Sequence, residues 1–173
     1  MAKGLPRSLG KSKAQGFQNA KTSLTDIPLS VSAVGAGVGF GSLSLDDLAL
    51  PEGDVIVLGI VANLSFTSED ANIAATWSGD FSIGTKATID ADLVDDDEAN
   101  LLPSTAIGPA VADVIASARY AAVPVEAAQI LELDAPEPLK INMLVDAANI
   151  TDASTGVISV SGDVSVAFVK LGG

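Results

Sequence analysis

The sequence predicts an all-β protein, with a single β-sandwich or jelly-roll-like domain at residues 29–173 and an extended basic arm at residues 1–28. Three observations lead to this prediction. After residue 28, apolar and polar side chains mostly alternate with period two, as in half-buried strands. Short stretches rich in Asp, Gly and Pro separate these segments. The first 25 residues hold too few large apolar side chains to offset the entropy of ordering them.

The clearest strand pattern lies at the C-terminus. There Val160, Val164 and Val166 share one face and the intervening polar residues share the other, which indicates a half-buried strand or a hairpin with a bulge near Gly162. Short strands separated by turns are typical of sandwiches and barrels, and we favour a jelly roll. The other expected strands cover residues 29–34, 55–66, 74–83, 86–93, 129–133 and 139–147.

Residues 104–123 interrupt the strand pattern. This segment is rich in Ala, and Pro109 suits the first position of a helix. Val111, Val114, Ile115 and Ala118 follow a spacing of three and four residues. We therefore expect a short helix here, with a further strand as the rival, because Val and Ile are poor helix formers.

The amino-acid composition excludes several kinds of functional site. The chain has 173 residues, with no Cys and no His. Disulfides, thiolate metal sites and histidine-based nucleophiles are therefore absent, and carboxylates are the remaining route to general acid–base chemistry. No apolar run approaches the roughly 20 residues of a membrane span. The sequence predicts a protein that is not an enzyme, uses no cofactor and has no membrane partner.

The charge is divided along the chain. Five of the nine basic residues precede the first acidic residue, Asp26, so residues 1–25 carry a side-chain charge of +5. The rest, with four basic and 22 acidic residues, carries −18. Such a body repels phosphate, and Phe17 is the arm's only aromatic side chain for stacking on a base, so nucleic acid is disfavoured as a partner. We predict a protein-binding arm, with a merely solvated tail as the alternative, and its contact residues are Lys3, Arg7, Lys11, Lys13, Phe17 and Lys21.

Two other features have competing interpretations. Residues 89–100 concentrate six acids, Asp90, Asp92, Asp95, Asp96, Asp97 and Glu98. Oxygen ligands suit Ca²⁺, but the spacing departs from the EF-hand loop, so we favour a solvated acidic turn and assign no metal site. Alternatively, the last four acids receive a neighbour's basic arm. Trp77, the only indole, is predicted to anchor the core and not to stack on a sugar.

The stretch DFSIGTKATIDADLVDDDEANLLPSTAIGPAVADV, together with LVDAANI and the final VSGDVSVAF, resembles small capsid decoration, or cement, proteins of tailed bacteriophages. The resemblance covers residue 77 to the C-terminus. It implies a β-rich module that trimerises and sits over junctions between capsomers, where it reinforces the shell. No functional residue of that family can be transferred to a position in this chain.

The sequence therefore predicts a virion structural protein on the outer capsid surface. Its expected partners are the major capsid protein and further copies of itself, as a homotrimer, with the basic arm contributing to anchoring. Two alternatives remain. One is another virion component, such as a head fibre base or a tail protein. The other is a secreted β-module that binds Ca²⁺ or carbohydrate through residues 90–98 or Trp77.

Overall fold

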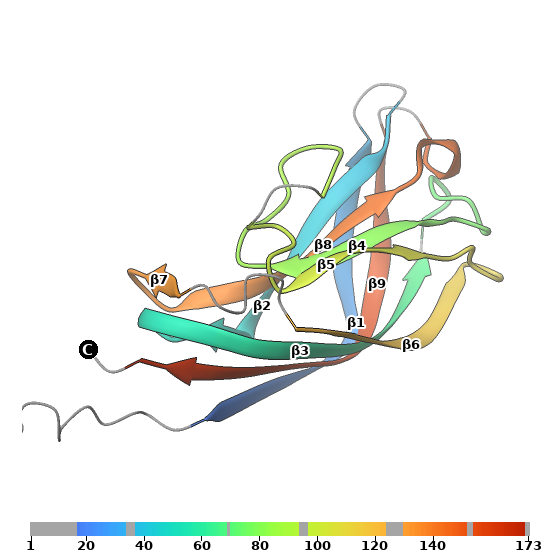
Figure 1. The fold of residues 1–173 in the computed structure, drawn as a ribbon. Helices are drawn as coiled ribbons and strands as arrows, with labels where there is room; N and C mark the ends of the chain where they lie inside the picture. The colour runs from blue at the N-terminus through green and yellow to red at the C-terminus, as the bar shows by residue number, and fades with distance from the viewer. Residues whose placement is uncertain are drawn as a thin grey trace, which may run out of the picture.

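A computed structural model describes residues 17–33, 37–68, 70–93, 97–123, 130–151 and 154–171, and nine strands account for most of them (Figure 1). Apart from the 3-10 turn η2 (Ala147–Asn149), the elements are strands. Within these ranges, no helix is long and apolar enough to cross a membrane. The strands are β1 (Gln18–Ala33), β2 (Gly39–Leu50), β3 (Gly53–Ser68), β4 (Gly79–Gly84), β5 (Leu102–Ile107), β6 (Val114–Ala122), β7 (Leu131–Leu133), β8 (Glu137–Val145) and β9 (Thr155–Lys170).

The strands form one antiparallel sheet that divides into two halves. The first half has the order β1-β9-β3-β6, and the second has the order β2-β8-β4-β5. They are joined where β1 meets β2, and β5 and β6 lie in contact at the opposite ends of the two halves. Strand β7 pairs with β3 and so belongs to the first half. The chain passes from one half to the other at the connections β1–β2, β2–β3, β3–β4, β5–β6, β7–β8 and β8–β9, which gives the double Greek-key order of a jelly roll. The predicted all-β, jelly-roll-like fold is confirmed.

The core lies between the two halves and is built from period-two strands. On β3, Val55 and Val57 are buried, and then a register shift between Val57 and Gly59 moves the buried positions to Ile60 and Ala62. A bulge of this kind adds one residue and keeps the apolar side chains inside. On β9 the buried positions include Val160, Val164, Val166 and Phe168. The strand is continuous, and the irregularity near Gly162 lies in its partner β1, between Leu24 and Ile27.

Aromatic side chains join the two halves across the core. Phe81 on β4 is fully buried, and its ring centroid lies 5.4 Å from that of Phe66 on β3 and 4.7 Å from that of Tyr120 on β6. Such tilted and edge-on pairs add about 0.5–1.5 kcal/mol each to the burial of their surface. Phe81 is therefore the side chain that ties the second half to the first.

The predicted helix within residues 104–123 is wrong. The structure places two strands there, β5 and β6, connected by a turn with a cis peptide bond between Gly108 and Pro109. The Ala-rich composition suits a helix in isolation, but pairing β6 with β3 buries Ile115 and places Tyr120 against Phe81. Tertiary pairing thus overrides a weak helix propensity, as the β-branched residues of β6 favour.

The strand expected at residues 86–93 is also wrong, because this stretch belongs to a loop between β4 and β5. Conversely, β2 was not predicted, since its glycine-rich start hides the alternation. β1 begins at Gln18, so residues 18–28, which the sequence assigns to the arm, form the first part of this strand. Residues 1–16 lie outside the described residues.

We expect Phe81→Ala to lower the free energy of unfolding by about 3–5 kcal/mol, because it opens a cavity where the two halves meet. Phe17→Ala is the matched control, since 65% of Phe17 is exposed, and its effect should stay within about 0.5 kcal/mol. Urea unfolding measures both variants. Equal stabilities for the two variants would contradict the bridging role of Phe81.

Candidate functional site

The described part of the predicted arm is attached to the body. Phe17 directly precedes β1 and is mostly exposed. The Lys21 Nζ atom on β1 lies 3.2 Å from Oδ1 of Asp163 on β9, and the Ser23 hydroxyl donates a 2.5 Å hydrogen bond to the same oxygen. Lys21 is therefore engaged by the protein's own sheet. The other predicted contact residues, Lys3, Arg7, Lys11 and Lys13, lie outside the described residues.

This pair has an electrostatic consequence. The hydrogen bond from Ser23 and then that from Lys21 lower the pKa of Asp163 below its ordinary value of 3.8. A carboxyl group whose pKa is lower in the folded state stabilises the fold above its ordinary pKa, and this contribution is lost as the pH falls through the folded value. Asp163 thus helps to fasten β1 to β9 at neutral pH.

Residues 85–93 and 97–101, between β4 and β5, form a loop that is held by Asn142 of β8. Asn142 is fully buried, and its Nδ2 donates to the carbonyl oxygens of Lys86 (2.9 Å) and Glu98 (2.8 Å). Its Oδ1 accepts from the Thr88 amide at 3.0 Å and from the Ser42 hydroxyl at 2.5 Å. Because buried polar groups are costly without partners, one side chain fixes the loop to β2 and β8.

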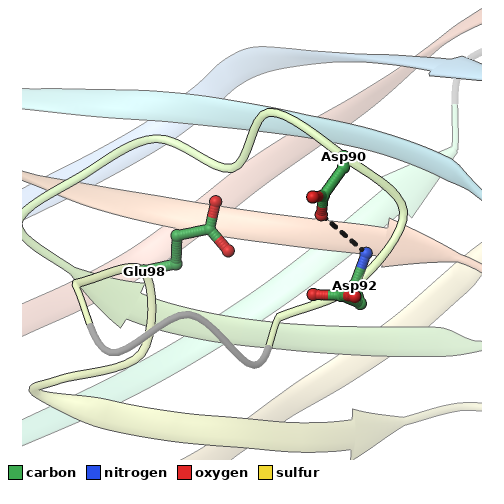
Figure 2. Close-up of side chains that lie close together, drawn as sticks. All are labelled: Asp90, Asp92 and Glu98. Carbon is green, nitrogen blue, oxygen red and sulfur yellow. Dashed lines mark hydrogen bonds between the residues drawn. The ribbon is translucent and has the colours of Figure 1, made fainter.

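This loop brings together three of the predicted acids, Asp90, Asp92 and Glu98 (Figure 2). One carboxylate oxygen from each lies within 4.8 Å of the others, with Asp90 and Asp92 exposed and Glu98 buried. The Asp92 amide donates to Asp90 at 3.2 Å, and the Ile89 amide donates to Glu98 at 3.3 Å. These oxygens are of the type that Ca²⁺ prefers, although a calcium site takes six to eight ligands.

The remaining acids of the stretch do not join this cluster. Asp97 forms an ion pair with Lys86, and its carbonyl oxygen accepts the amides of Thr85 and Lys86. Asp95 and Asp96 lie outside the described residues. The structure therefore splits the predicted contact set Asp95, Asp96, Asp97 and Glu98, since Glu98 turns inward and Asp97 binds its own loop.

Trp77 is a core residue, as predicted. It is fully buried, and its Nε1 donates to the carbonyl oxygen of Asp113 at 3.1 Å. The indole is thus removed from any surface on which a sugar could stack.

Two acids of the second half, Asp80 on β4 and Asp146 directly after β8, interact electrostatically. Burial, and then the charge of Asp146, raise the pKa of Asp80 above its ordinary value of 3.8. The Ser78 hydroxyl donates a 2.5 Å hydrogen bond to Asp146. The ionised form of Asp80 therefore costs stability, and this cost appears as the pH rises from 3.8 through the raised folded value.

An apolar groove, which the sequence did not predict, lies on the outer face of the first half. It has a volume of about 400 Å³, and small residues of β3, β6 and β9 form much of its lining, including Gly59, Ala121, Ala122 and Ala167. Leu58 and Val123 beside it are 40% and 69% exposed. The signal was present in the apolar run at residues 55–61, because an unbroken run puts apolar side chains on both faces of a strand.

We expect Asn142→Leu to lower the free energy of unfolding by about 3 kcal/mol, because it leaves buried carbonyl and amide groups of the loop without partners. Trypsin should then cleave faster after Lys86, the loop's basic residue. Asn63→Leu, at an exposed position on β3, is the control. Unchanged cleavage at Lys86 in Asn142→Leu would refute the anchoring role.

We expect Asp80→Asn to raise stability at pH 7 by less than about 1 kcal/mol, since Asp80 remains partly solvated. The gain should vanish below pH 3.8, where both side chains are neutral. Asp163→Asn should do the opposite and lower stability at pH 7. Urea unfolding across the pH range measures the stability of both variants. A stability change of the same sign in both variants at pH 7 would contradict the opposite pKa shifts of Asp80 and Asp163.

No protein-family model and no curated protein matches the chain. Solved structures that resemble it include three viral capsid structures. Infectious bursal disease virus, Gx strain, matches 89% of this chain at 15% identity with a TM-score of 0.43, and this chain spans 32% of that one. The cyanophage Pam1 capsid matches 89% of this chain and 84% of its own at 17% identity and a TM-score of 0.37. The nodavirus particle from Macrobrachium rosenbergii matches 91% of this chain and 85% of its own chain, at 8% identity and with a TM-score of 0.35. The jelly-roll assignment itself rests on the strand order described above.

Proposed function

We propose that the chain is a non-enzymatic structural protein of a virion that binds the outer surface of the capsid and reinforces the junctions between capsomers. The major capsid protein and further copies of the chain, as a homotrimer, are its partners. The basic arm supplies part of the attachment. The observation that carries this proposal is the division of charge, with +5 on residues 1–25 and −18 on the remainder.

The way in which the arm joins the body supports a role as an anchor. Residues 1–16 lead directly into β1, and β1 pairs with β9 from Gln18 to Ser32, interrupted only between Leu24 and Ile27. Tension on the arm along the strand axis is shared by the hydrogen bonds of this ladder. A protein held on a shell through its N-terminal segment would therefore transmit load into its central strands.

Fold and composition agree with this proposal. The double Greek-key jelly roll is an architecture that viral capsid proteins share with lectins and cupins. The chain lacks the His and Cys side chains on which many hydrolytic and metal sites depend. The resemblance of residues 77–173 to phage decoration proteins favours the capsid over the other uses of this fold. Individual exposed ion pairs contribute only about 0–1 kcal/mol, so repeated attachment across a shell supplies the avidity.

A virion component of another kind, a head fibre base or a tail protein, is the second candidate, because the division of charge suits any protein lattice. Electron microscopy of intact particles labelled on this chain separates the two. A secreted carbohydrate-binding module gains no support from Trp77, which is buried.

We expect neutralisation of the arm by Lys3→Gln, Arg7→Gln, Lys11→Gln and Lys13→Gln to weaken binding to assembled shells of the encoding phage by about tenfold or more, given about 0–1 kcal/mol per lost charge contact. The control neutralises Lys140 and Lys170 in the body. Sedimentation with purified shells at low and high salt measures binding. Undiminished binding by the arm variant would remove the arm from the mechanism.

A further inference from the structure

The outer face that holds the groove also carries two carboxylates, which lie beyond Leu58 toward the start of β3. On β3, Val55 and Val57 point into the core, so Asp54, Ile56 and Leu58 point outward along one row. The strand register places Glu132 of β7 directly opposite Asp54, and both are exposed. Among the described residues, neither carboxylate is joined to a cation. The face therefore carries an apolar groove with Arg119 of β6 beyond one end, opposite Asn63, and two exposed acids further along β3 in the other direction.

Like charges placed directly opposite on neighbouring strands destabilise a sheet. Asp54 and Glu132 are such a pair, so a cation that binds between them relieves repulsion as well as gaining attraction. A partner for this face should be extended, carry apolar side chains that fill a groove lined by small residues, and be basic. It should also lack acids, which the two carboxylates would repel.

The first 16 residues of this chain, MAKGLPRSLGKSKAQG, have these properties. They include Leu5 and Leu9 as large apolar side chains, four basic residues and no acid. The small residues that line the groove let an extended backbone approach closely. We propose that the groove receives residues 1–16 of a second copy of the chain.

The place where the segment leaves the sheet favours a second copy over the same chain. Asn19 of β1 lines the groove at its edge, and Gln18 lies opposite Phe168 near the end of β9 (Figure 1). A chain that continues the axis of β1 in the N-terminal direction runs off the end of the sheet and leaves its own groove behind. Sixteen extended residues span about 50 Å, at 3.3 Å each, which is enough to reach a neighbour.

This inference rests on the part of the proposed function that gives the arm a protein partner, and it holds with or without a shell. The contact joins two different surfaces, so repetition closes into a ring when the rotation between copies allows it. A ring of three copies would present three identical arm-to-groove contacts.

Cysteine cross-linking tests the contact, because the full chain contains no cysteine of its own. A chain carrying Leu9→Cys is mixed with a chain carrying Ala121→Cys, and formation of the mixed disulfide is followed under mild oxidation. The control replaces Ala121→Cys by Ala106→Cys, which is an exposed alanine on β5 of the other half. A parallel series with Leu5→Cys covers a shift of the segment along the groove.

We expect the mixed disulfide at Ala121 to form about tenfold or more faster than at Ala106, because docking raises the effective concentration of the two thiols. Equal rates at both positions would overturn the proposal. A doubly substituted chain, Leu9→Cys with Ala121→Cys, that cross-links only within itself would also overturn it, by assigning the groove to its own arm.

A second measurement does not depend on disulfides. Ala121→Arg should reduce self-association in sedimentation experiments and Ala106→Arg should not, while salt should weaken the association of the unaltered chain. Shell binding is measured separately on the same variants. Cross-linking at Ala121 without shell binding would reject the decoration role and support the groove contact. Arm-dependent shell binding without cross-linking would support the decoration role and reject the groove contact.

Discussion

The pairing of β9 between β1 and β3 is the constraint on which the rest of the structure depends. β9 is the last strand of the chain, yet it lies between the first and the third and pairs with both along most of its length. The first half of the jelly roll therefore forms only when both ends of the chain meet. This places the start of β1 beside the end of β9, and it fixes where the basic segment leaves the body. Closure of so long a loop also predicts slow folding for a chain of this size.

Local pattern predicted the elements that bury one face. The alternation is clearest in β9, because that strand has a core side with Val160, Val164 and Val166 and a more exposed side. The same logic failed for β6, where Ala-rich composition imitates a helix and only the pairing with β3 decides the outcome. It failed again at residues 86–93, which read as a strand but serve as a covering loop. No local signal states that Asn142, 44 residues beyond Glu98, will hold that loop.

The two outer faces of the sandwich differ in how far other parts of the chain cover them. On the second half, Asn142 is buried beneath the described part of the loop and binds the carbonyl oxygens of Lys86 and Glu98. On the first half, Leu58 is 40% exposed, and the neighbouring Gly59 lines a groove formed largely by small side chains. The sequence did contain a sign of this asymmetry, since residues 55–61 are apolar without alternation. That run predicts a strand, and it also indicates that both faces of the strand are apolar.

The charge distribution then limits what can cover the exposed face. A body with 22 acidic and few basic residues repels other copies of itself when the acidic surfaces meet. A contact between copies is therefore favoured where one side is basic, and five of the nine basic residues lie in the first 25 residues. A symmetric contact between two identical acidic faces would have no basic side. An arm inserted into a neighbour's groove, as proposed above, supplies opposite charge at each contact. The proposed arm-to-groove contact is head-to-tail for this reason, whatever surface the assembly lies upon.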